Sequence, residues 1–309
     1  MNKLIIGPKC NNMNRVVQHA CLFLLVMGLF SCEKNSRDDF QSEEWGNYWF
    51  QGRAEISTFE LKQMRYGEER LGEAALIYVT EDFSRKKHVK LDHPESAGND
   101  KVPVLKLNQT RSFLTGIYPY QVMSSAFTPI FEDTFGLKFS SSIQEWCGHT
   151  YLQVNRQSKT KYSAKLFSYF EQEGDADFTF SGILEDDLWN ILRINPKYIP
   201  LGKVDLLPSL VHLRLFHLPL STVEAEITMM SIENGKKRLV VNYPAIKRNL
   251  EIDFEARFPF EILAWKETVT TKEGVAEVST AKRKGFRSID YWNRNSNADE
   301  FLRKELNLN

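Results

Sequence analysis

The sequence predicts a mainly β protein, in which an antiparallel meander forms a curved sheet, half-barrel or sandwich, with a few short helices and a C-terminal helix. Apolar residues recur with a period of two along most of the chain beyond residue 53, as they do in half-buried strands. Turn signals containing Gly or Asn separate these runs. Hydrophobic residues make up 42% and aromatic residues 12% of the 309 residues, which is enough to build a core.

The first half of the chain reads as paired strands. Ala54–Tyr66 places Ile56 and Thr58 in phase and then, after a slip of one residue, Phe59 and Leu61. The turn GEER then leads into LGEAALIYVTEDF, which predicts a hairpin. Three further stretches read as strands: VPVLKLNQ, a pair around Gly148 in GLKFSSSIQEWCGHTYLQVNR, and KYSAKLFSYFEQEGD.

The second half shows the same period more clearly. Its successive strand segments are KVDLLPSLVHLRLFHLPL, VEAEITMMSIENGKKRLVVNY and NLEIDFEARFPFEILAWKETV. Asn234-Gly235 is the strongest hairpin signal, because both central positions of a type I′ turn need a positive φ. Two helices are expected: Leu184–Arg193, with its acidic residues at the positive N-terminal end, and Ser296–Leu306, where Ser296 and Asp299 have capping-box spacing.

The N-terminal segment predicts export. Ala20–Phe30 is apolar apart from Gly28 and is about 11 residues long, whereas a membrane-spanning helix needs roughly 20. That length matches the apolar core of a secretory signal, roughly 7–15 residues. The flank before it is positive, with Lys3, Lys9 and Arg15 and no acidic residue. We therefore expect a signal peptide over residues 1–31, with Met13 as an alternative start.

The residues that follow predict a lipid anchor. Leu29-Phe30-Ser31-Cys32 resembles a bacterial lipobox, in which the cysteine becomes a diacylglyceryl thioether and the new amino group is acylated, for example by palmitate. Two or three long chains hold a protein on a membrane far better than one. The expectation is a bacterial cell-envelope protein, lipid-anchored at the outer membrane through Cys32. An ordinary cleaved signal followed by an unrelated cysteine is the alternative.

Domain organisation follows from these boundaries. Residues 32–44 are mostly polar and charged and predict a lipidated flexible tether. Residues 45–309 predict a single β-rich domain, with a subdivision near 182–200 as the alternative. Cys10 and Cys21 fall in the signal peptide, so Cys147 is left without a disulfide partner once Cys32 is lipidated. Packing alone must therefore stabilise the fold.

Charge argues against a nucleic-acid partner. The full chain has 40 basic and 40 acidic residues, and loss of residues 1–31 removes three basic residues and no acid, which leaves a net charge of −3. A dedicated nucleic-acid binder would show a basic excess or stripe.

Several stretches resemble one family of bacterial envelope lipoproteins over nearly the whole mature chain. They include WFQGRAEISTFELKQMRYGE, QEWCGHTYLQVN, LEDDLWNILRINP and DYWNRNSNADEFLRKEL. Members of this family often carry the label "septum formation inhibitor Maf". The Ser-x-Ser-Pro-Arg-Arg stretch of Maf-type nucleotide pyrophosphatases is absent from this sequence. The resemblance therefore implies an uncharacterised lipoprotein and carries no catalytic residue over. At the level of fold alone, the meander is also similar to the half-barrel of outer-membrane lipoprotein carriers.

One short segment offers a candidate catalytic site. Glu145, Cys147 and His149 alternate in EWCGH, so an unbroken strand would place all three on one face. Such a group suits a metal cluster or a Cys–His nucleophilic pair. Gly148 is expected to break or turn the strand, and a lone cysteine beside a hydrogen-bonded histidine is the more common arrangement.

Other polar groups suggest no cofactor or metal. His212 and His217 are five residues apart, which puts them on opposite faces of a strand. The residues His88, Asp92 and His93 lie in a basic segment that reads as a solvated turn. Glu185, Asp186 and Asp187 resemble a calcium loop, but a helix N-terminus accounts for them without an ion.

Aromatic residues gather in two places. One group is Trp45, Tyr48, Trp49 and Phe50, and the other is Tyr118, Tyr120, Met123, Phe127 and Phe131. Core packing is the first interpretation, and an apolar groove for an acyl chain or another polymer is the second. The sequence therefore supports a non-enzymatic envelope lipoprotein that binds an apolar ligand, a glycan or an envelope protein. The alternative is an envelope hydrolase or transferase that uses the Glu145/Cys147/His149 region.

Overall fold

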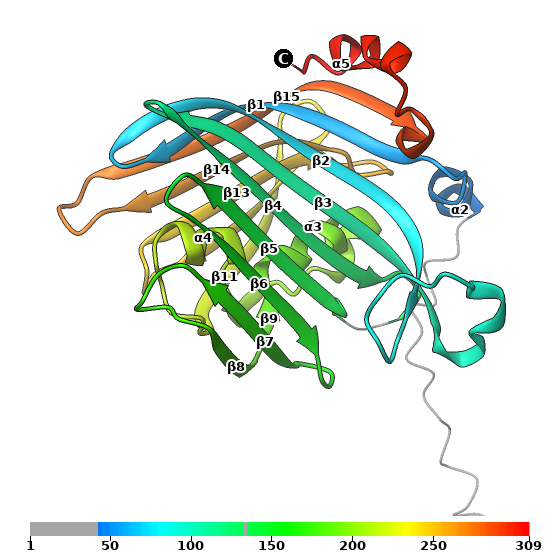
Figure 1. Ribbon diagram of the computed structural model, residues 1–309, viewed down its shortest axis with the longest axis horizontal. Helices are drawn as coiled ribbons and strands as arrows, with labels where there is room; N and C mark the ends of the chain where they lie inside the picture. Colours follow the sequence, from blue (N-terminus) through cyan, green and yellow to red (C-terminus); the bar gives the residue numbers. More distant parts are fainter. Residues whose placement is uncertain (1–42, 133–134, 309) are drawn as a thin grey trace, which may run out of the picture. The chain divides into compact units, whose positions relative to one another are not determined.

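A computed structural model describes residues 43–132 and 135–308. Its strands pair into one 15-stranded sheet that is barrel-like and nearly closed (Figure 1). The strands are β1 (Ala54–Arg65), β2 (Glu68–Ser84), β3 (Lys101–Thr115), β4 (Tyr118–Pro129), β5 (Lys138–Glu145), β6 (Gly148–Arg156), β7 (Lys161–Ser168), β8 (Ala176–Ser181), β9 (Ile183–Leu184), β10 (Gly202–Leu207), β11 (Val223–Ile232), β12 (Lys236–Tyr243), β13 (Arg248–Glu255), β14 (Ile262–Thr270) and β15 (Ala276–Ile289). The predicted mainly β class is confirmed.

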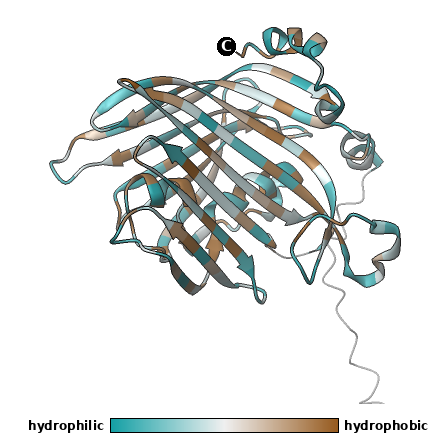
Figure 2. Ribbon diagram, in the orientation of Figure 1, coloured by the Kyte–Doolittle hydropathy of each residue, from teal (hydrophilic) through white to brown (hydrophobic). Residues whose placement is uncertain are grey.

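The strand order explains how the sheet curves back on itself. Strands β1 to β8 form one antiparallel meander and β10 to β15 form another. The first and last strands pair with each other, from Ala54 opposite Ile289 to Lys62 opposite Thr280, and this pairing joins the two halves. The sheet therefore has its two free edges at β8 and β9. Hydrophobic and hydrophilic residues alternate along the strands, as Figure 2 shows.

The predicted one-residue slip does not occur in β1, whose register with β2 is continuous, and the irregularity at this point is a β-bulge in the neighbouring strand β15. Thr58 lies opposite Gly285, whereas Phe59 lies opposite Arg283, so Lys284 has no partner in the register of β1. Phe59 and Leu61 keep the phase of the buried residues Glu55 and Ser57, and neither has any exposed surface. The other face of β1 is covered as well, since Thr58 donates to the carbonyl of Leu306.

The predicted hairpin at Asn234-Gly235 is also confirmed. These two residues have φ values of 60° and 70° and connect β11 to β12. The predicted hairpin between β1 and β2 is also present, but it turns at Tyr66 (φ 57°) and Gly67 (φ 73°), so only Gly67 of GEER lies in the turn and the rest of GEER begins β2. Both turns satisfy the positive-φ requirement of a type I′ hairpin.

Four α-helices occur in the described part of the chain. They are α2 (Glu43–Trp49), α3 (Glu185–Ile194), α4 (Leu210–Leu215) and α5 (Phe301–Glu305). Short 3₁₀ turns accompany them at Pro94–Ser96, Gly98–Asp100, Pro196–Tyr198, Tyr291–Asn293 and Asn297–Asp299. Helix α3 and the C-terminal helix were predicted, and the capping box between Ser296 and Asp299 is present. None of these helices is both long and apolar enough to cross a membrane.

Two predictions about local structure need correction. The segment Lys203–Leu220 is a strand only as far as Leu207, after which the chain forms helix α4. Pro208 cannot donate to a strand ladder, and the side chain of Asp186 accepts the backbone N–H of Leu210 at 2.9 Å, which caps the new helix. At the other end of the chain, the last two residues of the predicted tether, Glu43 and Glu44, form the first turn of α2.

Helix α3 lies between the two halves of the sheet, and all ten of its residues are buried (Figure 1). Its three N-terminal acids were predicted to favour the helix end. They also make specific contacts with the surrounding strands and loops. Glu185 binds Arg248 of β13 and accepts a hydrogen bond from Tyr243 of β12 at 2.6 Å. Asp187 accepts the backbone N–H of Gly136 at 2.7 Å. Helix α3 therefore covers the middle of the inner face of the sheet, where the polar contacts of its N-terminal acids hold it.

Candidate functional site

The two free edges of the sheet meet at one residue. Gly182 alone joins β8, at one edge, to β9, at the other, and its N–H donates to the carbonyl of Thr160 at 2.9 Å. Its φ is 143°, and a Cβ atom there would come within 2.7 Å of the Thr222 side chain and 3.0 Å of the Asp205 carbonyl. A glycine is required for both reasons. We define the seam as this junction together with the gap that continues from it between β8 and residues 210–220.

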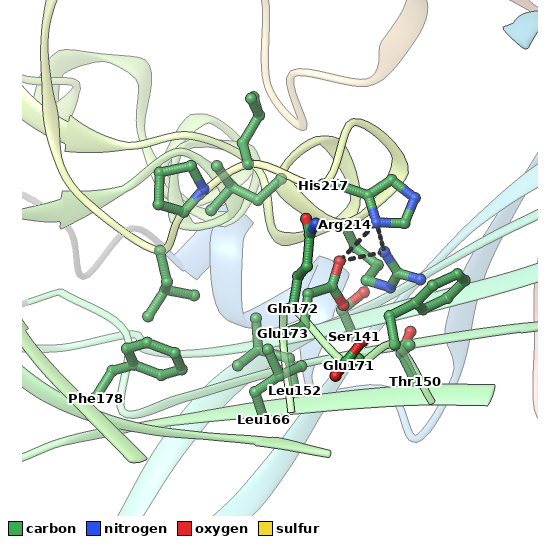
Figure 3. A pocket seen from close by; sticks show the side chains of 15 residues that line it. Ser141, Thr150, Leu152, Leu166, Glu171, Gln172, Glu173, Phe178, Arg214 and His217 are labelled. Carbon is green, nitrogen blue, oxygen red and sulfur yellow. Dashed lines mark hydrogen bonds and ion pairs between the residues drawn. The ribbon is translucent and has the colours of Figure 1, made fainter. Parts of the chain in front are cut away.

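A cavity of about 460 Å³ lies along the seam (Figure 3). One wall is the sheet, where Leu152 of β6 lies opposite Leu166 of β7, and Phe178 of β8 continues the surface. The other wall is helix α4 and the loop after it, with Leu213, Leu218 and Leu220. The leucines and Phe178 of the two walls offer dispersion contacts, and Gln172 adds a polar side chain to the lining between them.

One end of the cavity is polar. The carboxylate of Glu173, in the β7–β8 loop, accepts from Arg214 Nη1 at 2.7 Å and from His217 Nδ1 at 2.8 Å. The guanidinium of Arg214 also lies 4.4 Å from the centre of the Phe170 ring. These contacts tie the β7–β8 loop to α4 and its following turn, as the dashed lines in Figure 3 show. Burial is the largest influence on Arg214 and lowers the pKa of its guanidinium, although Glu173 opposes that effect.

Two hydroxyl groups lie at this polar end. Ser141 of β5 and Thr150 of β6 line the cavity, and each side chain is only 4% exposed. The Oγ of Ser141 is buried and has no hydrogen-bond partner among the described residues. The Nε of Arg214 is likewise buried and has no hydrogen-bond partner among the described residues. Buried polar atoms without partners are uncommon in proteins, and each needs an explanation.

Of the three catalytic candidates, Glu145 and Cys147 lie near this end, whereas His149 is exposed and lies next to the inward-facing Thr150 on β6, so its side chain points to the other face of the sheet. Glu145 ends β5 and His149 lies in β6, with Cys147 in the tight turn between them. Cys147 is exposed, and its backbone N–H donates to the Glu145 carboxylate at 2.7 Å. His149 bonds instead to the hydroxyl of Ser142 at 2.9 Å. The strand that would have aligned the three side chains is interrupted by a turn at Trp146 and Cys147, one residue before the expected break at Gly148, which begins β6.

The electrostatics of this turn oppose a nucleophilic role for the cysteine. A hydrogen bond to Glu145, together with its negative charge, raises the pKa of the Cys147 thiol. The thiolate is the reactive form of cysteine, so a raised pKa reduces the reactive fraction. Glu145 and Cys147 do line a second, smaller cavity of about 100 Å³, which shares Thr150, Arg214 and His217 with the seam cavity.

The remaining histidines and acids have separate partners. His212 lies in α4, not in a strand, and bonds to Glu267 of β14 at 2.8 Å. His217 follows that helix with a φ of 52° and binds Glu173. His88 and Asp92 lie in the β2–β3 loop, with His93 3.5 Å from Glu95. Within the ranges 43–132 and 135–308, no three His, Cys, Asp or Glu side chains are grouped as metal ligands would be.

The predicted aromatic clusters belong mainly to the core. Trp45 and Trp49 are each 2% exposed, and Tyr120 is 3% exposed and stacks on Phe113 with ring centres 5.0 Å apart. Phe50, Met123 and Phe131 are partly exposed and do not line the seam cavity. An apolar cavity exists, but it is built from leucines and phenylalanines of other segments.

The sequence contains a signal for this cavity, but the interpretation of Lys203–Leu220 as a strand obscured it. Pro208 and Pro219 bracket a run in which Leu210, Val211, Leu213 and Leu215 are apolar at helical rather than alternate spacing. Read as a helix, this run would have brought Arg214 and the loop after it into consideration. The cavity also depends on strand pairings between segments far apart in the sequence, which no local pattern reveals.

The predicted lipidation residue Cys32, the signal peptide over 1–31 and most of the tether lie outside the described residues. The domain boundaries at 45–309 and near 182–200 stay predictions.

Comparison with known proteins shows little similarity in sequence. No family model matches the chain, and no curated protein matches it. Among solved structures, the chain is similar to a crystal structure described as a beta-barrel-like protein of domain of unknown function DUF1849, from Brucella abortus. The sequence identity is 6%, the TM-score is 0.47, and the match covers 77% of this chain and 98% of that chain. The β-barrel-like description of this chain rests on its own strand order, in which β1 and β15 pair and, among the described strands, only β8 and β9 are edges.

Proposed function

We propose that this chain is a lipid-anchored protein of the bacterial cell envelope that binds an apolar ligand in the seam cavity without catalysing a reaction on it. The observation that carries the proposal is the cavity itself, about 460 Å³ with two apolar walls. Ligand sites in proteins commonly measure roughly 300–1,000 Å³ and are lined mostly by apolar side chains with a few polar groups. This cavity has both properties.

The chemistry of the walls favours a flexible hydrocarbon chain. Leu152, Leu166 and Phe178 face the aliphatic side chains of Leu213, Leu218 and Leu220 across the seam. Each methylene group that leaves water for such a surface contributes about 0.8 kcal/mol. An acyl chain would gain from several of these contacts at once, and it needs no hydrogen-bond partner along its length.

The anchoring part of the proposal rests on the sequence. The apolar run Ala20–Phe30, its basic flank and the lipobox-like Leu29-Phe30-Ser31-Cys32 support processing and acylation at Cys32. Metabolic labelling with a clickable fatty acid tests it. The full chain is expected to take up the label, and Cys32→Ser is expected to lose it. Labelling that is absent from the parent chain, or unchanged in the variant, would disprove the anchor.

The absence of catalysis is supported by the turn geometry. His149 binds Ser142 and is not paired with the thiol, and the contact of Glu145 with Cys147 raises the pKa of that thiol instead of lowering it. A Cys–His pair needs the two side chains within hydrogen-bond reach. The proposal therefore assigns this hairpin to the structure around the cavity and not to a reaction.

Ligand binding is tested by filling the cavity. Leu166→Trp places an indole in the space between the two walls, and the full chain carrying it is expected to lose most of its capacity for an apolar fluorescent probe such as N-phenyl-1-naphthylamine. Leu71→Trp is the matched control, because Leu71 is 69% exposed on β2 and does not line the cavity. Equal probe binding by the parent chain and Leu166→Trp would show that the seam is not the binding site.

A further inference from the structure

The two ends of the seam cavity differ in chemistry, as Figure 3 shows. Phe178 lies at one end, Ser141, Thr150, Arg214 and His217 lie toward the other, and Leu152 and Leu166 lie between them. The register of the sheet enforces part of this order. Ser141 lies opposite Leu152, which in turn lies opposite Leu166, so a polar residue and two leucines form one row across β5, β6 and β7. A ligand that fills the cavity needs a polar head and an apolar tail.

The polar end offers hydrogen-bond donors that are not already used. The Oγ of Ser141 and the Nε of Arg214 are buried and lack partners among the described residues. Ser141 is 4% exposed, so water has little access to it. Leaving such a group without a partner costs free energy that a suitable ligand atom would recover.

The carboxylate already present does not satisfy these donors. Glu173 accepts from Arg214 Nη1, from His217 Nδ1 and, at 2.6 Å, from Ser168 Oγ. Glu171 lines the cavity too, but it is exposed to solvent. A cationic head would lie beside the guanidinium of Arg214 and be repelled by it, whereas a hydrogen-bond acceptor would supply a partner to the two groups that lack one.

We infer that the seam cavity binds a long-chain carboxylic acid, with its tail between the leucine walls and its carboxylate at Ser141 and the Nε of Arg214. This inference rests on the proposed function and adds the class of ligand. A planar carboxylate suits the site because its two oxygens can accept from a hydroxyl and from a guanidinium at the same time. Thr150, beside Ser141 at the same end, supplies a further hydroxyl.

Three ligands with the same tail separate the head-group chemistry from apolar binding. Dodecanoate, dodecanol and dodecylamine are titrated by calorimetry, below their micelle concentrations, into the full chain carrying Cys32→Ser so that no protein-bound acyl group competes. Dodecanoate is expected to bind about tenfold or more tightly than dodecanol, because a hydrogen bond to a charged group contributes more than a neutral one. Dodecylamine is expected to bind more weakly than dodecanol.

Two variants locate the head group. Ser141→Ala removes the unpartnered hydroxyl and is expected to weaken dodecanoate binding about three- to tenfold while leaving dodecanol within about twofold. Ser140→Ala is the matched control, because Ser140 is the next residue on β5 and its side chain points to the other face of the sheet. Arg214→Gln is expected to remove the preference for the carboxylate, with circular dichroism confirming the fold.

The outcomes distinguish this inference from the proposed function. Equal affinities for dodecanoate and dodecanol, or a carboxylate preference that survives both Ser141→Ala and Arg214→Gln, would overturn the assignment of the ligand class while the apolar site stands. No binding of any of the three ligands, together with no binding of the naphthylamine probe, would overturn the proposed function itself.

Discussion

Arg193, at the end of α3, binds the carboxylate of Glu55 on β1 through both of its terminal nitrogens, with Nη2 to Oε2 at 2.6 Å. The two side chains are 1% and 2% exposed, which makes this a fully buried ion pair between residues 138 positions apart. The Nε of Arg193 donates to the Pro259 carbonyl at 2.9 Å. Helix α3 is therefore attached at one end to the first strand and to the loop before β14. At the other end it is attached to β12 and β13.

Removing one partner of this ion pair is expected to destabilise the fold strongly. Glu55→Gln leaves the Arg193 guanidinium buried without its counter-charge, which costs about 3–5 kcal/mol in comparable proteins. Denaturant unfolding measures the change in free energy. Glu224→Gln is the control, because the Glu224–Lys203 pair is largely exposed and its loss should leave the midpoint unchanged. Similar midpoints for both variants would show that the buried pair does not hold α3.

Asp186 is expected to make stability depend on pH. Burial raises the pKa of its carboxyl from 3.8 to about 6, so the folded state binds this proton more tightly than the unfolded chain does. The contribution of Asp186 is therefore fully favourable below about pH 4 and is lost as the pH rises through about 6. Asp186→Asn cannot ionise, and an amide can still accept from the Leu210 N–H and donate to Ser209.

The Asp186→Asn variant should become more stable relative to the parent chain as the pH rises from about 4 to about 7.5. The expected gain in relative unfolding free energy is on the order of 2 kcal/mol. Urea unfolding of both chains at the two pH values measures it. A difference between variant and parent that stays constant across this range would show that Asp186 does not titrate as described.

Gly182 is expected to be irreplaceable at the seam. Gly182→Ala forces a residue with a Cβ into a φ of 143° and into contact with Thr222 and the Asp205 carbonyl, and we expect a loss of about 2–4 kcal/mol. Gly202→Ala has a positive φ of 96° but open space around the added Cβ, so it measures the backbone effect alone. Equal losses in thermal unfolding would mean that close packing at the seam contributes nothing.

The Cys147–His149 hairpin is expected to be dispensable for binding. Cys147→Ala and His149→Ala should each leave the affinity for dodecanoate unchanged, because neither side chain lines the seam cavity. The same calorimetric titration measures both variants. A loss of affinity of tenfold or more in either would show that this hairpin contributes to the site, and a loss of function in cells with binding intact would favour the hydrolase or transferase alternative.

The strands were predictable because their signals are local. The dipeptide Asn234-Gly235 is visible within a few residues and forms the expected turn. The run Leu184–Arg193 was predictable as a helix for the same reason. Its position in the middle of the sheet was not, because that depends on partners such as Glu55 and Arg248, far away in the sequence. The expected phase change between Thr58 and Phe59 was wrong, because β1 keeps one phase and buries residues on both of its faces.

The seam cavity was beyond prediction for a related reason. Its walls come from β6 to β8 and from α4, and the alternation of apolar residues in those strands is the same whether a core, a ligand or solvent covers them. Ser141 illustrates the difficulty, since a serine between two others in SSS reads as a surface residue. In the folded chain Ser141 pairs with Leu152, and its hydroxyl is buried.

The pairing of β1 with β15 also has a consequence for biosynthesis. A ribosome makes β1 near the beginning of the domain and β15 near its end. Strand β1 therefore has only β2 as a neighbour until nearly the whole chain has been synthesised. Contacts between such distant segments slow folding, and an unpaired strand edge can pair with another chain and promote aggregation during synthesis. Truncation before Ala276 would leave β1 and β14 both open at once, so a shortened translation product should be cleared by proteases or found in inclusion bodies.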